Sequence, residues 1–480
     1  MQKYYYSLSS FPRKWESSKI KKFWIPVYAG MTGIRMFILF CLLVLSLGFG
    51  GCNSHSSPVW TVMVYMAGDN NLSTDLLKDL GEMEAVGSTD KVKVVVQIDT
   101  FGGTTKRYLV KKGRSLLLED LGEQNMADHK TIRDFIQWAA GRYPASRYAL
   151  ILSSHGDGLA KRIPYHPAER TQGRILQDDT DTDRLPGAPC CLSNTVVREA
   201  IEETGIYFDL LGFDASMMGQ IETAYEFKNL ADILVFSQEI GEANGWDYTA
   251  ILRALKSDPV LMRGEELADV IVESYKAFYE EIFYPREGTP DSGKYLTISS
   301  IRLGSSLNDL AVEIDELAGL LTGGLSGEDS EMHEILLSAI GEARDNTQDL
   351  NSLTTPDIYV DLFDLMENLM DSLKKRDAGN PPLLLQEIEN KVESIIAKKD
   401  DVILSEYHGV ARSGATGLSL TFFKLPDATE MRPYYEITRL FDPYTGEGSQ
   451  VQFFHDFRWD GFLQTYTACL GYSTDACMSE

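Results

Sequence analysis

Short apolar runs alternate with helix-like segments through the first half of the chain. Runs with the length and composition of buried strands occur at 60–66, 91–98, 148–152, 208–213 and 233–236. Apolar residues spaced three or four positions apart predict helices at 72–86, 131–140, 193–203 and 217–227, and 105–118 has the pattern of a hairpin. This alternation indicates an α/β fold, in which helices cover both faces of a mostly parallel sheet.

The pattern changes to amphipathic helices after residue 300. Helical spacing of apolar residues predicts helices at 307–321, 331–343, 360–373 and 383–396, and a strand-like run follows at 417–423. An aromatic-rich stretch then continues through Trp459 and Phe462. We therefore divide the chain into a domain at 59–300 and a mostly helical C-terminal lobe at 301–480, whose last strand can return to the main sheet.

The N-terminal residues have the pattern of a processing segment. Residues 36–49 form an apolar run preceded by Arg35, which is typical of a secretory signal and short for a transmembrane helix. Cys52 directly follows two glycines and resembles the cysteine of a bacterial lipobox, so that 36–52 implies an exported lipoprotein anchored in the membrane. Simple secretion is the alternative.

The residues on either side of 36–52 do not belong to the signal-like segment. Residues 1–35 fit neither a signal nor a folded element, so we expect translation to begin at Met31 or Met36 and treat 1–35 as a non-native extension. Residues 53–58 are a polar linker. The extension at 1–35 therefore contributes nothing to the predicted fold.

The chain is strongly acidic, with 45 Lys and Arg against 71 Asp and Glu and a formal net charge of −26. The first 51 residues hold seven basic residues and one acidic residue, which leaves −32 for the remainder. Such a surface repels nucleic acid, so we expect no nucleic-acid partner. It favours cationic ligands, although acidity that only maintains solubility is the simpler interpretation for most of it.

Polar residues with catalytic chemistry follow two of the predicted strands. The strand at 148–152 leads to His155 and Gly156, and the strand at 208–213 leads to Asp214 and Ser216. The carboxyl ends of parallel strands meet at one edge of a sheet. There the histidine can act as a general base or acid, and backbone N–H groups around Ser216 can stabilise an oxyanion. Each feature alone also has a structural explanation: His-Gly as a loop, and Asp214 as a helix N-cap.

Together these motifs resemble the clostripain family of cysteine peptidases, in which one strand ends in His-Gly and another in Asp-Ala-Cys. Further segments that look familial are Tyr65–Leu72, Phe213–Tyr225, 237–239 with 245–248, 417–423 and 459–463. The resemblance therefore covers nearly all of the chain after the linker. It implies a caspase-like fold, with a mostly parallel sheet flanked by helices.

The resemblance also implies roles for individual residues. His155 would be the catalytic histidine, and the N–H groups of Gly156 and Ser216 would be the oxyanion donors. Asp214 would lie at the bottom of the pocket for the side chain before the cleaved bond, P1, where a carboxylate pairs with Arg or Lys. The expected partner is a peptide or protein substrate with a basic P1 residue, cleaved by an endopeptidase.

Ser216 departs from the family, because it stands where the nucleophilic cysteine should be. A thiol has a reference pKa of about 8.5 and ionises readily beside a histidine, whereas a hydroxyl does not. Serine hydrolases rely on a base held by a third group. Three interpretations stay open: an inactive lipoprotein that binds basic peptides or a partner protein, a hydrolase in which Ser216 is catalytic, and a sequence variant of an active enzyme. Docking of envelope proteins on the helical lobe is a further possibility.

An acidic run precedes the helix at 193–203. Its candidate calcium ligands are Asp178, Asp179, Asp181 and Asp183. The resemblance to clostripain makes calcium a reasonable cofactor, but the spacing is not that of an EF-hand, and a solvated loop is the favoured alternative.

Two further expectations concern covalent changes. Family members are often activated by cleavage after a basic residue in the loop that follows the histidine. The candidates here are Lys161, Arg162, Arg170 and Arg174. In an exported chain, Cys469 and Cys477 can also close a small disulfide.

Overall fold

The computed structural model describes residues 57–159, 174–178, 191–350, 359–376, 381–422 and 451–471. The signal-like run, Cys52 and most of the linker lie outside this part of the chain. Within it, none of the helices combines the length and the apolar character that crossing a bilayer requires.

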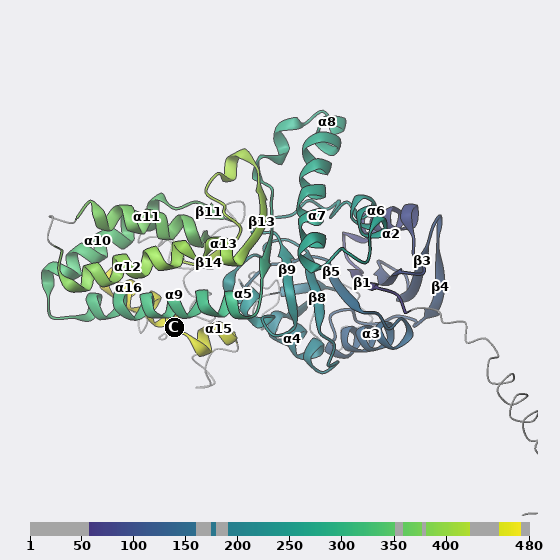
Figure 1. Cartoon of the computed structure of the whole chain (residues 1–480), viewed down its shortest axis with the longest axis horizontal. Coiled ribbons are helices and arrows are strands. Elements are labelled where there is room, and N and C mark those ends of the chain that lie inside the picture. Colours follow the sequence, from purple (N-terminus) through teal and green to yellow (C-terminus); the bar gives the residue numbers. More distant parts are fainter. Residues whose placement is uncertain are drawn as a thin grey trace, which may run out of the picture. The chain divides into compact units, whose positions relative to one another are not determined.

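A nine-stranded sheet forms the centre of the fold (Figure 1). In spatial order its strands are β13 (Ile403–His408), β10 (Thr297–Arg302), β9 (Ala231–Phe236), β8 (Phe208–Asp214), β5 (Arg147–Ser153), β1 (Trp60–Gly68), β2 (Val92–Thr100), β3 (Lys106–Lys111) and β4 (Arg114–Asp120). The central strands from β9 to β2 run parallel, and both edges are antiparallel. The predicted α/β class, the strands and the hairpin are thus confirmed.

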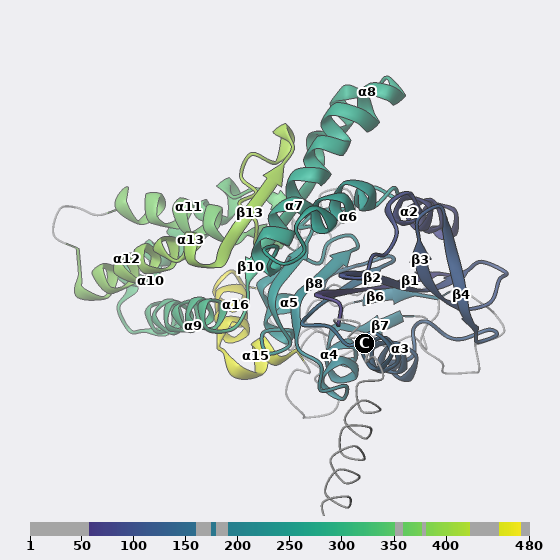
Figure 2. The same ribbon diagram turned by 45° about the vertical axis from the view of Figure 1, so that its right-hand side comes forward.

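Helices cover both faces of the sheet, as the sequence predicts (Figure 2). They are α2 (Ser73–Val86), α3 (His129–Arg142), α4 (Asn194–Glu202), α5 (Ile221–Glu226), α6 (Tyr248–Ser257) and α7 (Gly264–Ala277). Alternation along the strands decides which helices each side chain meets. Met63 and Tyr65 of β1 share a hydrophobic cluster with α3, α4 and α5, whereas Val62 and Val64 join the cluster of α2, α6 and α7.

The C-terminal lobe is mostly helical, with α9 (Ser305–Ser326), α10 (Ser330–Asn346), α11 (Leu362–Lys374), α12 (Leu383–Ala397) and α16 (Trp459–Cys469). The cluster that covers the α3 face of the sheet continues into it, through residues such as Leu307, Phe363 and Val392. α11 begins later than the pattern predicts, because Asp361 accepts hydrogen bonds from the Phe363 and Asp364 N–H groups and so caps the helix.

The last strand does not return to the main sheet. It forms β14 (Ser419–Thr421), which pairs with β12 (Tyr359–Asp361) in a small sheet completed by β11 (Asp349–Leu350). β13 occupies the edge of the main sheet instead. The predicted disulfide is not tested: Cys469 has no disulfide partner among the described residues, and Cys477 lies outside them.

Candidate active site

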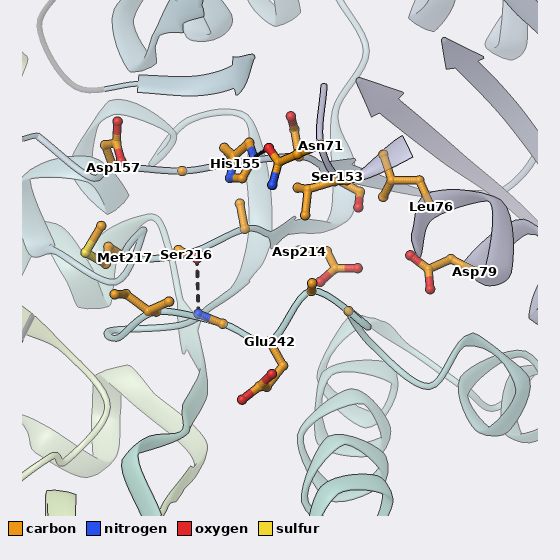
Figure 3. A pocket seen from close by; sticks show the side chains of 18 residues that line it. Asn71, Leu76, Asp79, Ser153, His155, Asp157, Asp214, Ser216, Met217 and Glu242 are labelled. Carbon is orange, nitrogen blue, oxygen red and sulfur yellow. Dashed lines mark hydrogen bonds between the residues drawn. The ribbon is translucent and has the colours of Figure 1, made fainter. Parts of the chain in front are cut away.

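The two strand ends singled out in the sequence meet at one edge of the main sheet. Ser153, the last residue of β5, pairs in register with Asp214, the last residue of β8. A cavity of about 280 Å³ opens beside them. His155, Asp214 and Ser216 line this cavity (Figure 3). Gly156 lines it as well.

His155 is half-buried and is oriented by an asparagine from another strand end. Its Nε2 atom lies 2.7 Å from Oδ1 of Asn71, in the turn between β1 and α2 (Figure 3). Since the amide oxygen can only accept, Nε2 carries the proton, and in a neutral imidazole Nδ1 is then the basic nitrogen. The neighbouring Asn70 is buried and fixes the turn, because its Nδ2 donates to the carbonyls of Ala67 and Gln177.

Ser216 lies in a tight turn between β8 and α5. The helix expected from 217 begins only at Ile221, and Met217 takes a left-handed conformation with φ of 55°. The Met217 N–H donates to the Glu239 carbonyl at 2.9 Å. The Gly241 N–H donates to Ser216 Oγ at 3.1 Å, whereas no hydrogen bond joins Ser216 and His155 among the described residues. The helix therefore does not begin directly after Ser216, and the backbone N–H that reaches its hydroxyl comes from Gly241.

Gly156 is required by the close approach of the two loops. A Cβ atom at this position would lie 2.4 Å from the carbonyl oxygen of Ser216. Its role as an oxyanion donor, together with the N–H of Ser216, stays a prediction.

Asp214 is not a helix N-cap, which corrects the alternative interpretation of this residue. Gln220 occupies the N-cap position of α5. The Asp214 carboxylate instead accepts hydrogen bonds from the Tyr248 hydroxyl at 2.8 Å and from the Trp246 N–H at 3.4 Å. Burial raises the pKa of Asp214 to about 6, although these hydrogen bonds oppose the shift.

A second carboxylate, Asp79 of α2, lines the same cavity and was missed by the sequence reasoning. Asp79 is only 1% exposed, and burial followed by the charge of Asp214 raises its pKa well above the ordinary value. Helical spacing could have revealed it. Asp79 lies three residues after Leu76 and four before Met83, and both of those side chains are buried.

Residues 240–243 and Gly245 form the cavity wall across from His155 (Figure 3). Tyr279, from the π-helix η1 (Phe278–Phe283), donates through its hydroxyl to the Gly245 carbonyl at 2.9 Å. Tyr284 donates in the same way to the Glu242 carboxylate at 2.6 Å. Glu239 is buried and forms an ion pair with Arg412 of the C-terminal lobe. The wall is thus fixed from both sides.

The predicted calcium and cleavage sites are only partly described. Asp178 is buried and accepts a hydrogen bond from the Met126 N–H at 2.8 Å, so the solvated-loop interpretation is wrong for this residue. Asp179, Asp181 and Asp183 lie outside the described residues, within which no group of three His, Cys, Asp or Glu side chains could hold a metal ion. Arg174 begins β6 (Arg174–Gln177), which pairs with β7 (Cys191–Ser193), while Lys161, Arg162 and Arg170 also lie outside.

Comparison with known proteins agrees with this architecture. A model of the clostripain family matches residues 64–466. Clostripain from Hathewaya histolytica is 25% identical over 284 residues, which are 51% of this chain and 52% of that protein. The chain therefore spans about half the length of this curated relative.

Solved structures show the same fold. A secreted C11 cysteine protease from Bacteroides thetaiotaomicron, in complex with an irreversible peptide inhibitor, has a TM-score of 0.54 and 20% identity over 80% of this chain and 98% of that chain. An inactive zymogen of a C11 protease from Parabacteroides distasonis has a TM-score of 0.53 and 18% identity, with coverages of 85% and 99%. Since the family model covers most of the chain, this protein belongs to the clostripain family and carries its caspase-like α/β fold.

Proposed function

We propose that this chain recognises peptides or proteins at a basic residue, in an endopeptidase-type site of the clostripain kind, and that Ser216 limits the site to little or no cleavage. One observation supports the preference for a basic residue. The cavity beside His155 and Ser216 is lined by the carboxylate of the half-buried Asp214, and none of the described residues that line it is Lys or Arg. An Arg or Lys side chain of a bound peptide would supply the missing positive charge.

The environment of Ser216 supports weak turnover. A hydroxyl needs a general base to become a nucleophile, whereas a thiol ionises readily. Ser216 Oγ accepts its hydrogen bond from the Gly241 amide and has none to His155 among the described residues. The binding-only alternative, in which basic peptides or a partner protein are captured without cleavage, follows from the same geometry.

A serine-dependent hydrolase is the second candidate, because the imidazole is already oriented. The 2.7 Å contact between Asn71 Oδ1 and His155 Nε2 resembles the third member of a catalytic triad, which holds the base in one tautomer. An amide lacks the negative charge of a triad carboxylate, so it would stabilise the imidazolium less.

Hydrolysis of fluorogenic Arg and Lys peptides tests these functions. We expect near silence from the unaltered protein and clear turnover from Ser216→Cys that is lost when His155→Ala is added. Calcium addition tests the predicted cofactor in the same assay. If the unaltered protein cleaves well and Ser216→Ala abolishes cleavage, the serine-dependent hydrolase is correct instead. If neither the unaltered protein nor Ser216→Cys cleaves or binds basic peptides, the proposed specificity is wrong.

We also infer that the protein is exported and anchored in the bacterial envelope through a lipid on Cys52. The signal-like run at 36–49 and the two glycines before the cysteine support the anchor, and the secreted relative from Bacteroides thetaiotaomicron supports export. Membrane fractions should retain the unaltered protein and release a Cys52→Ser variant. Equal recovery of both in the soluble exported fraction would indicate simple secretion.

A further inference from the structure

Two carboxylates, those of the buried Asp79 and the half-buried Asp214, lie together at one end of the cavity. Asp79 projects from α2 toward Asp214 at the end of β8 (Figure 3). A Cβ atom on Gly245 would lie 2.8 Å from Oδ2 of Asp214 and 3.2 Å from Oδ2 of Asp79, so the two oxygens are at most about 6 Å apart. The pair therefore forms a single acidic end of the cavity.

Among the described residues, no Lys or Arg lines the cavity beside this pair. Oδ2 of Asp79 has no hydrogen-bond partner among the described residues, although the side chain is almost fully buried. The nearest lysine in the sequence, Lys78, is exposed and pairs at 2.7 Å with Asp75 on the outer side of α2. A buried carboxylate without a partner is costly, so its natural partner is a ligand that brings positive charge.

We propose that Asp79 is a second specificity-determining carboxylate of the P1 pocket and that, together with Asp214, it selects arginine over lysine. This inference rests on the proposed function, because it assumes that a basic P1 side chain enters the cavity. The guanidinium is planar and presents five donors in a fork, so it can donate to both carboxylates at once. A lysine ammonium is a compact and strongly hydrated charge, and it reaches both oxygens less well.

The backbone around the pair supports this role. Gly245 has φ of +61° and lies against both carboxylates. Any side chain at this position would occupy the space between them, so the position requires glycine. Its carbonyl is held by Tyr279, and Asp214 is held by Tyr248, so the acidic end is rigid before a ligand arrives. Preorganised groups lose less freedom on binding.

Calorimetric titration of the full chain with acetylated peptides that end in arginine, lysine or citrulline tests the proposal. Citrulline is the uncharged analogue of arginine. We expect arginine to bind about tenfold more tightly than lysine and citrulline to bind least. Asp79→Asn should lower the affinity for arginine by about tenfold and for lysine by less than about threefold. Asp75→Asn, one turn earlier on the same helix, is the matched control and should change neither affinity.

The outcomes separate this inference from the proposed function. If both basic peptides bind and need Asp214, but Asp79→Asn leaves the ratio of the two affinities within about twofold, Asp79 has no role in selection and only the inference fails. If the unaltered protein binds no basic peptide, or Asp214→Asn binds as well as the unaltered protein, both fail. If Asp79→Asn folds poorly, the ratio of the arginine and lysine affinities can be measured in Asp79→Ser, a smaller polar replacement.

Discussion

Acidification should release a basic peptide from this protein, and the size of the effect follows from Asp214. The pKa of its carboxyl is raised to about 6, so the group is about 97% ionised at about pH 7.5 and about 9% ionised at about pH 5. If the cation binds only the ionised form, the apparent affinity falls about tenfold over this range, or about 1.4 kcal/mol. The pKa of Asp79 is raised as well, by burial and then by the charge of Asp214.

Without a bound peptide, acidification has the opposite effect, because it stabilises the folded protein. Both carboxyls have folded-state pKa values above their unfolded values, so the folded chain holds protons that the unfolded chain has lost. Their contribution to stability is therefore fully present below about pH 4 and is lost as the pH rises through about 6 and above. A bound arginine peptide should restore stability at neutral pH, and it should release protons as it binds near pH 6.

Other titratable groups surround the pair and must be separated from it. They are Asp75, Lys78 and Glu82 of α2, His155 after β5, Glu242 in the cavity wall, Asp247 and Tyr248 at the start of α6, and Tyr275 and Tyr279 on α7 and η1. Protonation of His155 would also weaken cation binding on acidification. Asp214→Asn keeps the histidine, so the part of the pH dependence that disappears in this variant belongs to Asp214.

The assay is a titration of the arginine peptide at half-unit steps between about pH 5 and 7.5, with the citrulline peptide as the uncharged control. We expect the affinity for arginine to rise about tenfold with pH and the affinity for citrulline to stay nearly constant. An arginine affinity that changes by less than about twofold, or a pH dependence that Asp214→Asn leaves intact, would refute the assignment of this step to the acidic end of the cavity.

Three further changes test other parts of the structure. Gly245→Ala should abolish binding of the arginine peptide in calorimetry, because the added methyl group lies between two carboxylates and the residue has positive φ; unaltered binding would contradict the described approach of this loop. Arg412→Ala should lower the free energy of unfolding in urea by about 3–5 kcal/mol, since the buried Glu239 loses its cation, and Arg412→Ala with Glu239→Gln should recover part of the loss. Glu222→Gln should raise stability by about 1–2 kcal/mol at pH 8 and not at pH 5, because burial raises the pKa of Glu222 to about 7; a gain that is equal at both pH values would exclude this cause.

The sequence predicts the central sheet well because its strands are buried on both faces. Such strands are continuous apolar runs, and β1, β5 and β8 stand out for this reason. The short strands escape prediction, since β6 and β7 contain only four and three residues and show no periodicity. β13 also escapes, because its sequence Ile-Leu-Ser-Glu-Tyr-His mixes apolar and polar residues at the edge of the sheet.

The candidate site is predicted only where the chemistry lies at strand ends. His155 and Asp214 could be found because topology brings the ends of neighbouring parallel strands together. Asp79 could not be recognised by its residue type, because a charged residue on an amphipathic helix is usually exposed. The turn at Met217 resembles the start of a helix in sequence, but the left-handed φ of this residue depends on contacts with the distant Glu239 segment.

The close contact at Gly156 means that the His-Gly motif is not by itself evidence of peptidase activity. The glycine has no room for a side chain, since a Cβ atom would meet the carbonyl oxygen of residue 216 whether that residue is serine or cysteine. Loss of cleavage would therefore not relax the demand for glycine, because any larger residue would displace the neighbouring loop. In a chain of this fold, the glycine of His-Gly is therefore explained by the packing of two loops. Only the side chains of residues 155 and 216 indicate whether the chain can cleave a peptide.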